Sequence, residues 1–137
     1  PFLRIAPICN GKIYVAPRSY QGEEPGKLDI PMEDYIYACK TDTDKYAKEV
    51  ENKYSNHITG QPEPRFSLKH LVKETNGVKK IIMLYILPLN DEEQIHFTGG
   101  KFVTPEEIEM NSAQYSSFLK EEVDHLNIVA QMWEEFK

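Results

Sequence analysis

The chain alternates short apolar stretches with polar segments rich in turn-forming residues. Apolar runs of strand length, bounded by Gly, Pro, Asn or Asp, predict β-strands. On this basis we predict strands at residues 2–9, 12–18, 28–32, 65–73, 78–89 and 94–103. The first two are joined by Asn10-Gly11, a strong hairpin signal because both residues tolerate positive φ. The chain therefore begins with a predicted β-hairpin.

Proline and glycine mark irregular points in these strands. Pro7 and Pro17 lie in the hairpin strands, and because proline lacks an amide donor we expect edges or irregularities there. Gly99-Gly100, inside the last predicted strand, indicates a bulge or a turn. A second Asn-Gly pair at residues 76–77 predicts another hairpin turn. The most apolar run, 78–89, predicts a central strand.

Three segments carry helical signals. Residues 44–56 follow a Thr-Asp-Thr-Asp string of capping residues. Thr104-Pro105 provides an N-cap and a first-turn proline for a short helix. Residues 116–136 predict a long helix, with Glu121-Glu122 on its solvated face. Its apolar stripe has spacings of four and three: Leu119, Val123, Leu126, Ala130 and Trp133. The order of elements predicts a mixed α/β (α+β) domain.

Length and charge narrow the possible functions. The 137 residues suit one domain with its own core. The net charge of −6 argues against broad electrostatic binding to nucleic acid, which requires a basic face. A nucleotide-like or phosphorylated small molecule remains compatible with this charge, because a local cationic pocket can lie on an acidic protein.

The cysteines and the start of the chain provide evidence on where in the cell the protein is located. Cys9 and Cys39 do not make a disulfide framework, and the four histidines have no zinc-like spacing. The longest apolar stretch, residues 81–87, is too short to span a bilayer. The chain lacks an initiator Met. We therefore expect a domain excised from a longer protein, either cytoplasmic or the cytosolic part of a larger, possibly membrane-bound, protein.

Several strings, in their order along the chain, resemble the Nudix family. "RIAPICNGKIYVAPRS" looks like the first hairpin of the family, and "LDIPM" resembles the strand that usually enters Pro-Gly-Gly. "GGKFVTPEEIE" looks like the late strand and the short capped helix that follows it. The resemblance covers nearly the whole chain. It implies one domain over residues 1–137, with a Nudix-like mixed β-sheet sandwiched between helices.

The Nudix box, G-x5-E-x7-R-E-U-x-E-E-x-G-U, is eroded in this sequence. Its best match starts at Lys48-Glu49-Val50, in the places of Arg, Glu and the apolar residue. The paired glutamates of the box then fall on Asn52 and Lys53. The family binds Mg²⁺ or Mn²⁺ through carboxylates on this helix face, and Mg²⁺ requires hard oxygen ligands. Because Lys53 reverses a charge, the resemblance implies a lost metal site.

The remaining acidic residues of this helix do not restore the site. Glu49 and Glu51, low-ranked catalytic candidates, are two positions apart, which separates them by about 200° around a helix. We expect no catalytic residue, metal or cofactor at the usual place. If the Nudix layout holds, the cations that could bind a ligand are Arg18, Lys48, Lys53 and Arg65.

The main hypothesis is a catalytically inactive Nudix-like domain that acts as a ligand-sensing or protein-interaction and regulatory module, contacting other domains of a parent protein. The alternative is a divergent Nudix hydrolase that cleaves a nucleoside diphosphate derivative with Mg²⁺ in a rearranged site built from Glu33, Asp34, Glu49 or Glu51. A third hypothesis is scaffolding through the C-terminal stripe, whose heptad-like spacing would permit a homodimer.

Overall fold

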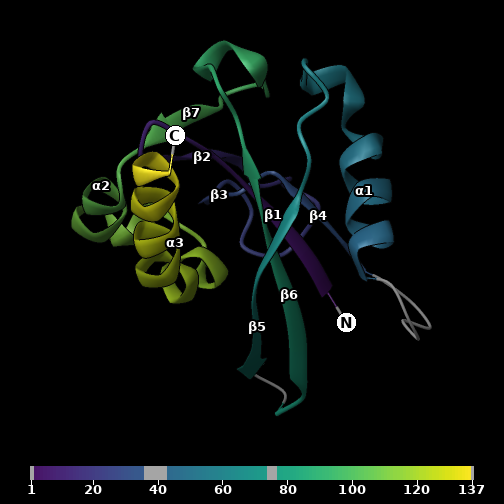
Figure 1. The fold of residues 1–137 in the computed structure, drawn as a ribbon. Helices are drawn as coiled ribbons and strands as arrows, with labels where there is room; N and C mark the ends of the chain where they lie inside the picture. Colours follow the sequence, from purple (N-terminus) through teal and green to yellow (C-terminus); the bar gives the residue numbers. More distant parts are fainter. Residues whose placement is uncertain (1, 36–42, 74–76, 137) are drawn as a thin grey trace.

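A mixed β-sheet with helices on both sides forms the domain, as the sequence predicts (Figure 1). The computed structural model describes residues 2–35, 43–73 and 77–136. The strands in these ranges are β1 (Phe2–Cys9), β2 (Lys12–Pro17), β3 (Leu28–Asp29), β4 (Met32–Tyr35), β5 (Arg65–Lys73), β6 (Lys79–Pro88) and β7 (Lys101–Val103). The helices are α1 (Thr43–Lys53), α2 (Pro105–Met110) and α3 (Ser117–Glu135), with 3₁₀ turns η1 (Ser55–His57), η2 (Glu92–Gln94) and η3 (Ser112–Gln114).

The strand order is β3-β2-β1-β6-β5, with β4 paired to β1 and β7 paired to β2. β1 runs parallel to β6 and antiparallel to β2 and β4. The predicted hairpin between β1 and β2 is confirmed, with φ of 54° at Asn10 and 73° at Gly11. The central place of β6, between β1 and β5, is also confirmed.

Pro7 does not make β1 an edge strand, but it does mark an irregularity. One side of β1 pairs continuously with β6. The other side pairs with β4 from Phe2 to Ile5 and with β2 only at Ile8 and Cys9. Pro7 therefore lies between the part of β1 that pairs with β4 and the part that pairs with β2. A missing amide donor costs little at this point. β2 and β4 diverge at this point, which leaves space between them.

Alternation along β1 distributes its side chains between two cores. Leu3 and Ile5 pack in the cluster that contains Ala47 and Val50 of α1. Ala6 and Ile8 pack in the cluster that contains Leu126 and other residues of α3. Figure 1 shows α1 on one side of the sheet and α2 with α3 on the other. Arg4 has the parity of the α3 side, so its guanidinium points into that layer.

Two predicted strands are wrong in extent. Residues 28–32 form β3 and the start of β4, interrupted at Ile30-Pro31. Residues 94–103 contain only β7, preceded by η2 and an irregular loop. The loop forms because its backbone bonds elsewhere: the Phe97 amide donates to the Tyr14 hydroxyl over 2.8 Å. The Asn76 turn lies outside the described residues, although β5 and β6 do pair as an antiparallel hairpin.

The helices follow the sequence signals closely. α1 ends at Lys53 and continues as η1, slightly short of the predicted end at residue 56. Thr104 caps α2 by accepting a hydrogen bond from the Glu107 amide, and Ser116 caps α3 in the same way through Leu119. The α3 stripe is buried at Leu119, Val123, Leu126 and Ala130. Among the described helices, none has both the length and the apolar character needed to cross a bilayer.

Candidate functional site

A pocket of about 490 Å³ opens where β2 and β4 diverge. We call it the Arg18 pocket. It is lined by the end of β2 and the loop after it, by the β3–β4 segment, by the end of α1 with η1, and by the loop before β7. Its charged residues are Arg18, Glu23, Asp29 and Glu33. Its volume falls in the range of small-molecule sites, which are usually concave with a few converging polar groups.

The side-chain rings of Tyr54, His57 and Phe97 form one wall of the Arg18 pocket. The His57 and Phe97 rings are stacked, with centroids 4.0 Å apart and an interplanar angle of 7°. The Tyr54 ring lies 5.7 Å from the Phe97 ring. The Tyr54 hydroxyl donates to the Glu33 carbonyl over 3.2 Å, and burial raises the pKa of this phenol. A planar ligand group can pack against such ring faces or edges.

The loop that carries Phe97 is held by Tyr14. The Tyr14 hydroxyl accepts from the Phe97 amide, and the Gly100 amide donates to the Phe97 carbonyl over 2.8 Å. A Cβ at Gly100 would lie 2.0 Å from the Tyr14 Oη atom, so no other residue fits there without movement. The ring wall of the pocket is therefore fixed by backbone contacts to β2.

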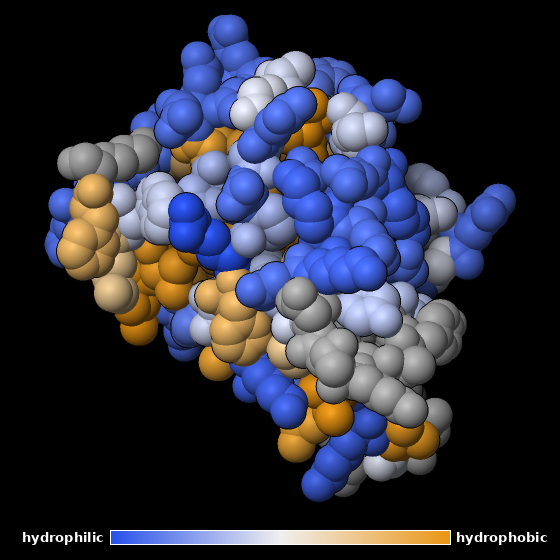
Figure 2. All heavy atoms as spheres, turned by 45° about the vertical axis from the view of Figure 1, so that its right-hand side comes forward, coloured by the Kyte–Doolittle hydropathy of each residue, from blue (hydrophilic) through white to orange (hydrophobic). Residues whose placement is uncertain are grey.

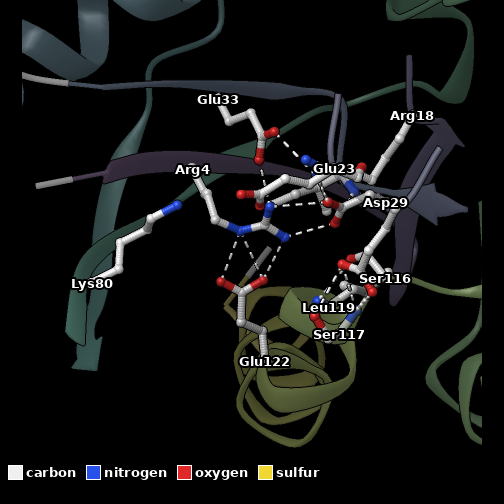
Figure 3. Close-up of polar contacts among 12 residues, drawn as sticks. Arg4, Arg18, Glu23, Asp29, Glu33, Lys80, Ser116, Ser117, Leu119 and Glu122 are labelled. Atoms are coloured by element: carbon white, nitrogen blue, oxygen red, sulfur yellow. Dashed lines mark hydrogen bonds and ion pairs between the residues drawn. The ribbon is translucent and has the colours of Figure 1, made fainter. Parts of the chain in front are cut away.

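The floor of the pocket is a buried ion-pair cluster centred on Arg4 (Figure 3). The Arg4 Nη2 atom donates to Asp29 Oδ1 over 2.7 Å and to Glu122 Oε1 over 2.8 Å. Its Nη1 atom donates to Glu33 Oε2 over 2.6 Å. Arg4 and Glu122 are fully buried. Five charged side chains, two arginines and three carboxylates, thus meet below the pocket: Arg4, Arg18, Asp29, Glu33 and Glu122.

Arg18 connects this cluster with the pocket. Its Nη1 atom contacts Asp29 Oδ2 and lies 3.1 Å from Glu33 Oε1, and its Nε atom donates to the Glu23 carbonyl over 2.8 Å. Within the described ranges, no protein group accepts a hydrogen bond from its Nη2 atom. A guanidinium presents five donors in a rigid fork, so Arg18 keeps donors for an anionic or carbonyl group in the pocket.

The two pocket carboxylates of the cluster have opposite pKa shifts. Burial pushes the pKa of Asp29 upward, but the nearby Arg4 and Arg18 charges outweigh it and hold the pKa below its ordinary value of 3.8. Burial is also the largest cause at Glu33, where it raises the pKa above 4.5 despite the attraction of Arg4. Glu33 is therefore the carboxyl of this pocket that binds a proton more readily.

Comparisons with known proteins agree on the architecture. No family model matches the sequence, and no curated protein matches it either. Solved structures do match it. A NUDIX hydrolase from Nitrosomonas europaea superposes with a TM-score of 0.63 at 10% identity, covering 94% of this chain and 88% of the other. The chain has a Nudix-like fold.

Two further structures extend this similarity. The NUDIX domain of Shewanella oneidensis NrtR, in a cocrystal with ADP ribose, matches with a TM-score of 0.59 at 13% identity, covering 99% of this chain and 87% of that chain. The C-terminal domain of mouse MUTYH, in complex with human PCNA, matches with a TM-score of 0.57 at 16% identity, covering 98% and 87%. At these identities the similarity establishes the fold alone.

The segment that the resemblance aligns with the Nudix box lies on α1. Glu49 is exposed and Glu51 is buried, so the two carboxylates face different surroundings, as their spacing predicts. Asn52 is exposed, and Lys53 forms an ion pair with Asp34. The hydrogen bond that Lys53 donates to Asp34 is the main reason that the pKa of Lys53 is raised. This helix face presents an amide and an ammonium where the family's box has paired glutamates.

The four predicted ligand cations lie in different places. Arg18 lines the Arg18 pocket. Lys48 and Arg65 line a second pocket of about 460 Å³ beside α1, and the Arg65 guanidinium lies 5.4 Å from the centroid of the Trp133 ring. Lys53 pairs with Asp34 at the surface. The structure therefore brings Lys48 and Arg65 together and leaves Arg18 in a separate pocket.

The sequence analysis does not predict the buried ion-pair cluster below the Arg18 pocket. Glu122, predicted on the solvated face of the last helix, is fully buried and also lies 3.1 Å from His70 Nε2. The signal was present, because Glu122 is three positions after Leu119 and so shares the apolar stripe. Across residues 2–35, 43–73 and 77–136, no group of three or more His, Cys, Asp or Glu is arranged to hold a metal ion.

Proposed function

We propose that this Nudix-like domain binds a nucleotide-like small molecule in the Arg18 pocket without hydrolysing it, and acts as a ligand-sensing or regulatory module. The observation that carries the proposal is the α1 face, where Asn52 and the Asp34-paired Lys53 stand in the positions of the box glutamates. Mg²⁺ and Mn²⁺ require clustered hard oxygen ligands, and an ammonium at this position repels them. The residues present do not fit the metal of the fold family.

The carboxylates of the pocket support the same conclusion. Asp29 contacts both Arg4 and Arg18, and Glu33 contacts both as well. A carboxylate that already has arginine partners gives up this stabilisation if it binds a cation instead. A divalent ion would therefore have to displace Arg4 or Arg18 from these carboxylates. The pocket is therefore better suited to a ligand with its own anionic and hydroxyl groups than to a metal.

The chemistry of the pocket walls matches a nucleotide-like ligand. The Tyr54, His57 and Phe97 rings offer contacts for a planar base. Arg18 offers donors for a phosphate oxygen, and the partly exposed Glu33 can accept from a sugar hydroxyl. The NrtR domain that shares this fold is seen with ADP ribose, which supports the same class of ligand here.

Calorimetric titration of the full chain with ADP-ribose in metal-free buffer tests the proposal. We expect saturable binding that does not require Mg²⁺ and that Arg18→Gln weakens by about tenfold or more, as for loss of a charged hydrogen bond. Lys120→Gln, which removes an exposed cation of α3, is the matched control and should bind normally. Thermal melting of both variants checks that they fold. Absence of binding to ADP-ribose and to nucleoside diphosphates would refute the proposal.

A second candidate is a divergent hydrolase, and Glu33 favours it. Its raised pKa and its place on the pocket beside Arg18 are properties of a general base. Asp34, Glu49 and Glu51 would then have to supply a rearranged Mg²⁺ site. Saturable Mn²⁺ binding in the presence of nucleotide that is lost in Glu49→Gln, together with nucleotide hydrolysis that is lost in Glu33→Gln, would favour this candidate over the inactive domain.

The regulatory hypothesis also predicts protein partners. The module would transmit ligand binding to other domains of a parent protein. The stripe proposed for a homodimer is buried in the core at Leu119, Val123, Leu126 and Ala130, so a homodimer would instead use the exposed Ile128 and Met132 of α3 and the adjoining Phe136. The MUTYH domain of the same fold is seen with a protein partner, so such contacts are compatible with the architecture. Sedimentation of the domain at increasing concentration tests the homodimer.

A further inference from the structure

A second site lies on α1, where a buried carboxylate lacks a hydrogen bond. Glu51 is 5% exposed, and within the described ranges its Oε2 atom has no hydrogen-bond partner. The Lys48 Nζ atom lies 3.2 Å away, close enough for an ion pair, but its orientation forms no hydrogen bond. The ion pair with Lys48 offsets part of the Glu51 charge, but a buried carboxylate oxygen without a hydrogen bond still loses hydration that is not replaced, so it is a candidate contact for a bound molecule.

Glu51 lines a cavity of about 470 Å³ that shares no lining residue with the Arg18 pocket. We call it the Glu51 cavity. One wall is α1, with Lys48, Asn52 and Ser55. The other wall is the segment after η1, including Ile58, Gly60 and Gln61. The volume is suitable for a small polar molecule.

The second wall of the Glu51 cavity is held in place by Gln94. The Thr59 amide donates to the Gln94 carbonyl over 2.9 Å, and the Gln94 side-chain amide donates to the Thr59 carbonyl over 3.1 Å. Gly60 has φ of +82°, and a Cβ there would lie 2.6 Å from Gln94 Nε2. The cavity is therefore preformed, which lowers the entropic cost of binding.

The charges of the cavity indicate what it binds. The Glu51 carboxylate can accept from a donor in the cavity. The Lys48 Nζ atom already donates to the Pro62 carbonyl over 3.4 Å, and this ammonium, on a side chain that is 43% exposed, keeps further donors for an acceptor. The neighbouring groups, Asn52, Ser55 and Gln61, are neutral and can both donate and accept. A phosphate would lie against the buried carboxylate, and a simple cation would meet the Lys48 ammonium. A ligand with both charges satisfies both residues.

We propose that Lys48 and Glu51 form the binding site of a small zwitterion, in which the ligand ammonium donates to Glu51 and the ligand carboxylate accepts from Lys48. A free α-amino acid has these two groups on one carbon. This site is independent of the Arg18 pocket, so the domain would respond to two different classes of small molecule.

The test uses the full chain with glycine, L-serine and L-glutamine as probes, followed by calorimetry and thermal melting. Methylammonium chloride and sodium acetate, which each carry one of the two charges, are the half-ligand controls. We expect at least one amino acid to bind with a dissociation constant of about 1 mM or lower. Glu51→Gln and Lys48→Met should each weaken binding by about tenfold or more.

Glu49→Gln, an exposed carboxylate on the same helix, is the matched variant and should bind normally. Arg18→Gln should also leave amino-acid binding unchanged, which separates this site from the nucleotide proposal. If Glu51→Gln does not fold, Lys48→Met carries the test alone. Absence of amino-acid binding, equal binding by Lys48→Met, or equally tight binding of methylammonium would each overturn the proposal.

Discussion

Arg4 and Glu122 are joined by three hydrogen bonds although 118 positions separate them in the sequence. Both side chains are fully buried between β1 and α3 (Figure 3). This contact ties the first strand to the last helix directly beneath the Arg18 pocket. Through the bonds of Arg4 to Asp29 and Glu33, it also fixes the groups that orient Arg18.

Removal of Glu122 should destabilise the fold strongly. Glu122→Ala leaves Arg4 buried with one counter-charge fewer, and loss of one member of a buried ion pair costs about 3–5 kcal/mol. Urea unfolding followed by circular dichroism measures this loss. The control is Glu121→Ala, an exposed neighbour that should change the free energy of unfolding by no more than about 0.5 kcal/mol. Equal effects of the two variants would contradict the buried cluster.

Local signals explain which parts of the fold the sequence predicts. Asn10-Gly11 defines the first hairpin, Thr104 and Ser116 cap their helices, and the stripe around Leu126 faces the core. Each depends on residues within a few positions. The sequence pattern predicts a strand for the loop before β7. This prediction is wrong because the conformation of the loop depends on Tyr14, which lies far away in the sequence.

The site was harder to predict for the same reason. The resemblance predicts Arg18 near a cleft, and its side chain lines a pocket, while its role in ligand binding stays a prediction. The Arg4 cluster combines residues from β1, β3, β4 and α3, and no local pattern relates them. Glu122 appeared to be one more charge on an acidic helix. A charged residue in register with an apolar stripe indicates a buried ion pair only when its partner is also known.

Asp29 and Glu33 should change the free energy of unfolding with pH in opposite directions. Between the lowered folded-state pKa of Asp29 and 3.8, only the unfolded chain binds the proton, so the free energy of unfolding falls as pH falls. Between 4.5 and the raised folded-state pKa of Glu33, the folded chain binds the proton, so the free energy of unfolding falls as pH rises.

Urea unfolding of two isosteric variants between about pH 3 and pH 7 separates these contributions. Relative to the wild type, Asp29→Asn should become less destabilising as the pH falls below 3.8. Glu33→Gln should become less destabilising as the pH rises above 4.5. Parallel pH profiles for the wild type and both variants would show that neither carboxyl has a shifted pKa.

Gly100→Ala should displace the ring wall of the Arg18 pocket. The new Cβ would lie 2.0 Å from the Tyr14 hydroxyl that holds the Phe97 amide, and such overpacking costs about 1–3 kcal/mol. We expect a lower midpoint of unfolding and weaker ADP-ribose binding. Gly22→Ala is the control for the midpoint of unfolding alone, because Gly22 lines the pocket but the nearest non-neighbouring atom to its new Cβ would be 3.9 Å away. Wild-type behaviour of Gly100→Ala would show that the loop is not held in this way.

The buried stripe of α3 should stabilise the fold of the single chain. Leu126 is fully buried, whereas Ile128 is 59% exposed on the same helix. Leu126→Ala should cost about 2–5 kcal/mol through lost burial and a residual cavity. Ile128→Ala should cost no more than about 0.5 kcal/mol in a monomer. A large, concentration-dependent effect of Ile128→Ala would instead place the exposed side of α3 in a dimer interface.

The net charge of −6 does not favour nucleic acid as the ligand, because such binding requires a basic face. Figure 2 shows one face of the molecule, on which hydrophilic residues predominate and hydrophobic residues form smaller groups. In the described chain, polar side chains line the Arg18 pocket and the Glu51 cavity. Small molecules are therefore the ligands to test first.

Product analysis of ADP-ribose, incubated with the full chain and Mg²⁺ or Mn²⁺, tests the central claim most directly. The resemblance aligns Asn52 and Lys53 with the box glutamates, so we expect ADP-ribose to be recovered intact. AMP should not exceed the level of the protein-free control, for the wild type and for Glu49→Gln alike. Formation of AMP by the wild type, lost in Glu49→Gln, would contradict the account and identify the domain as a hydrolase.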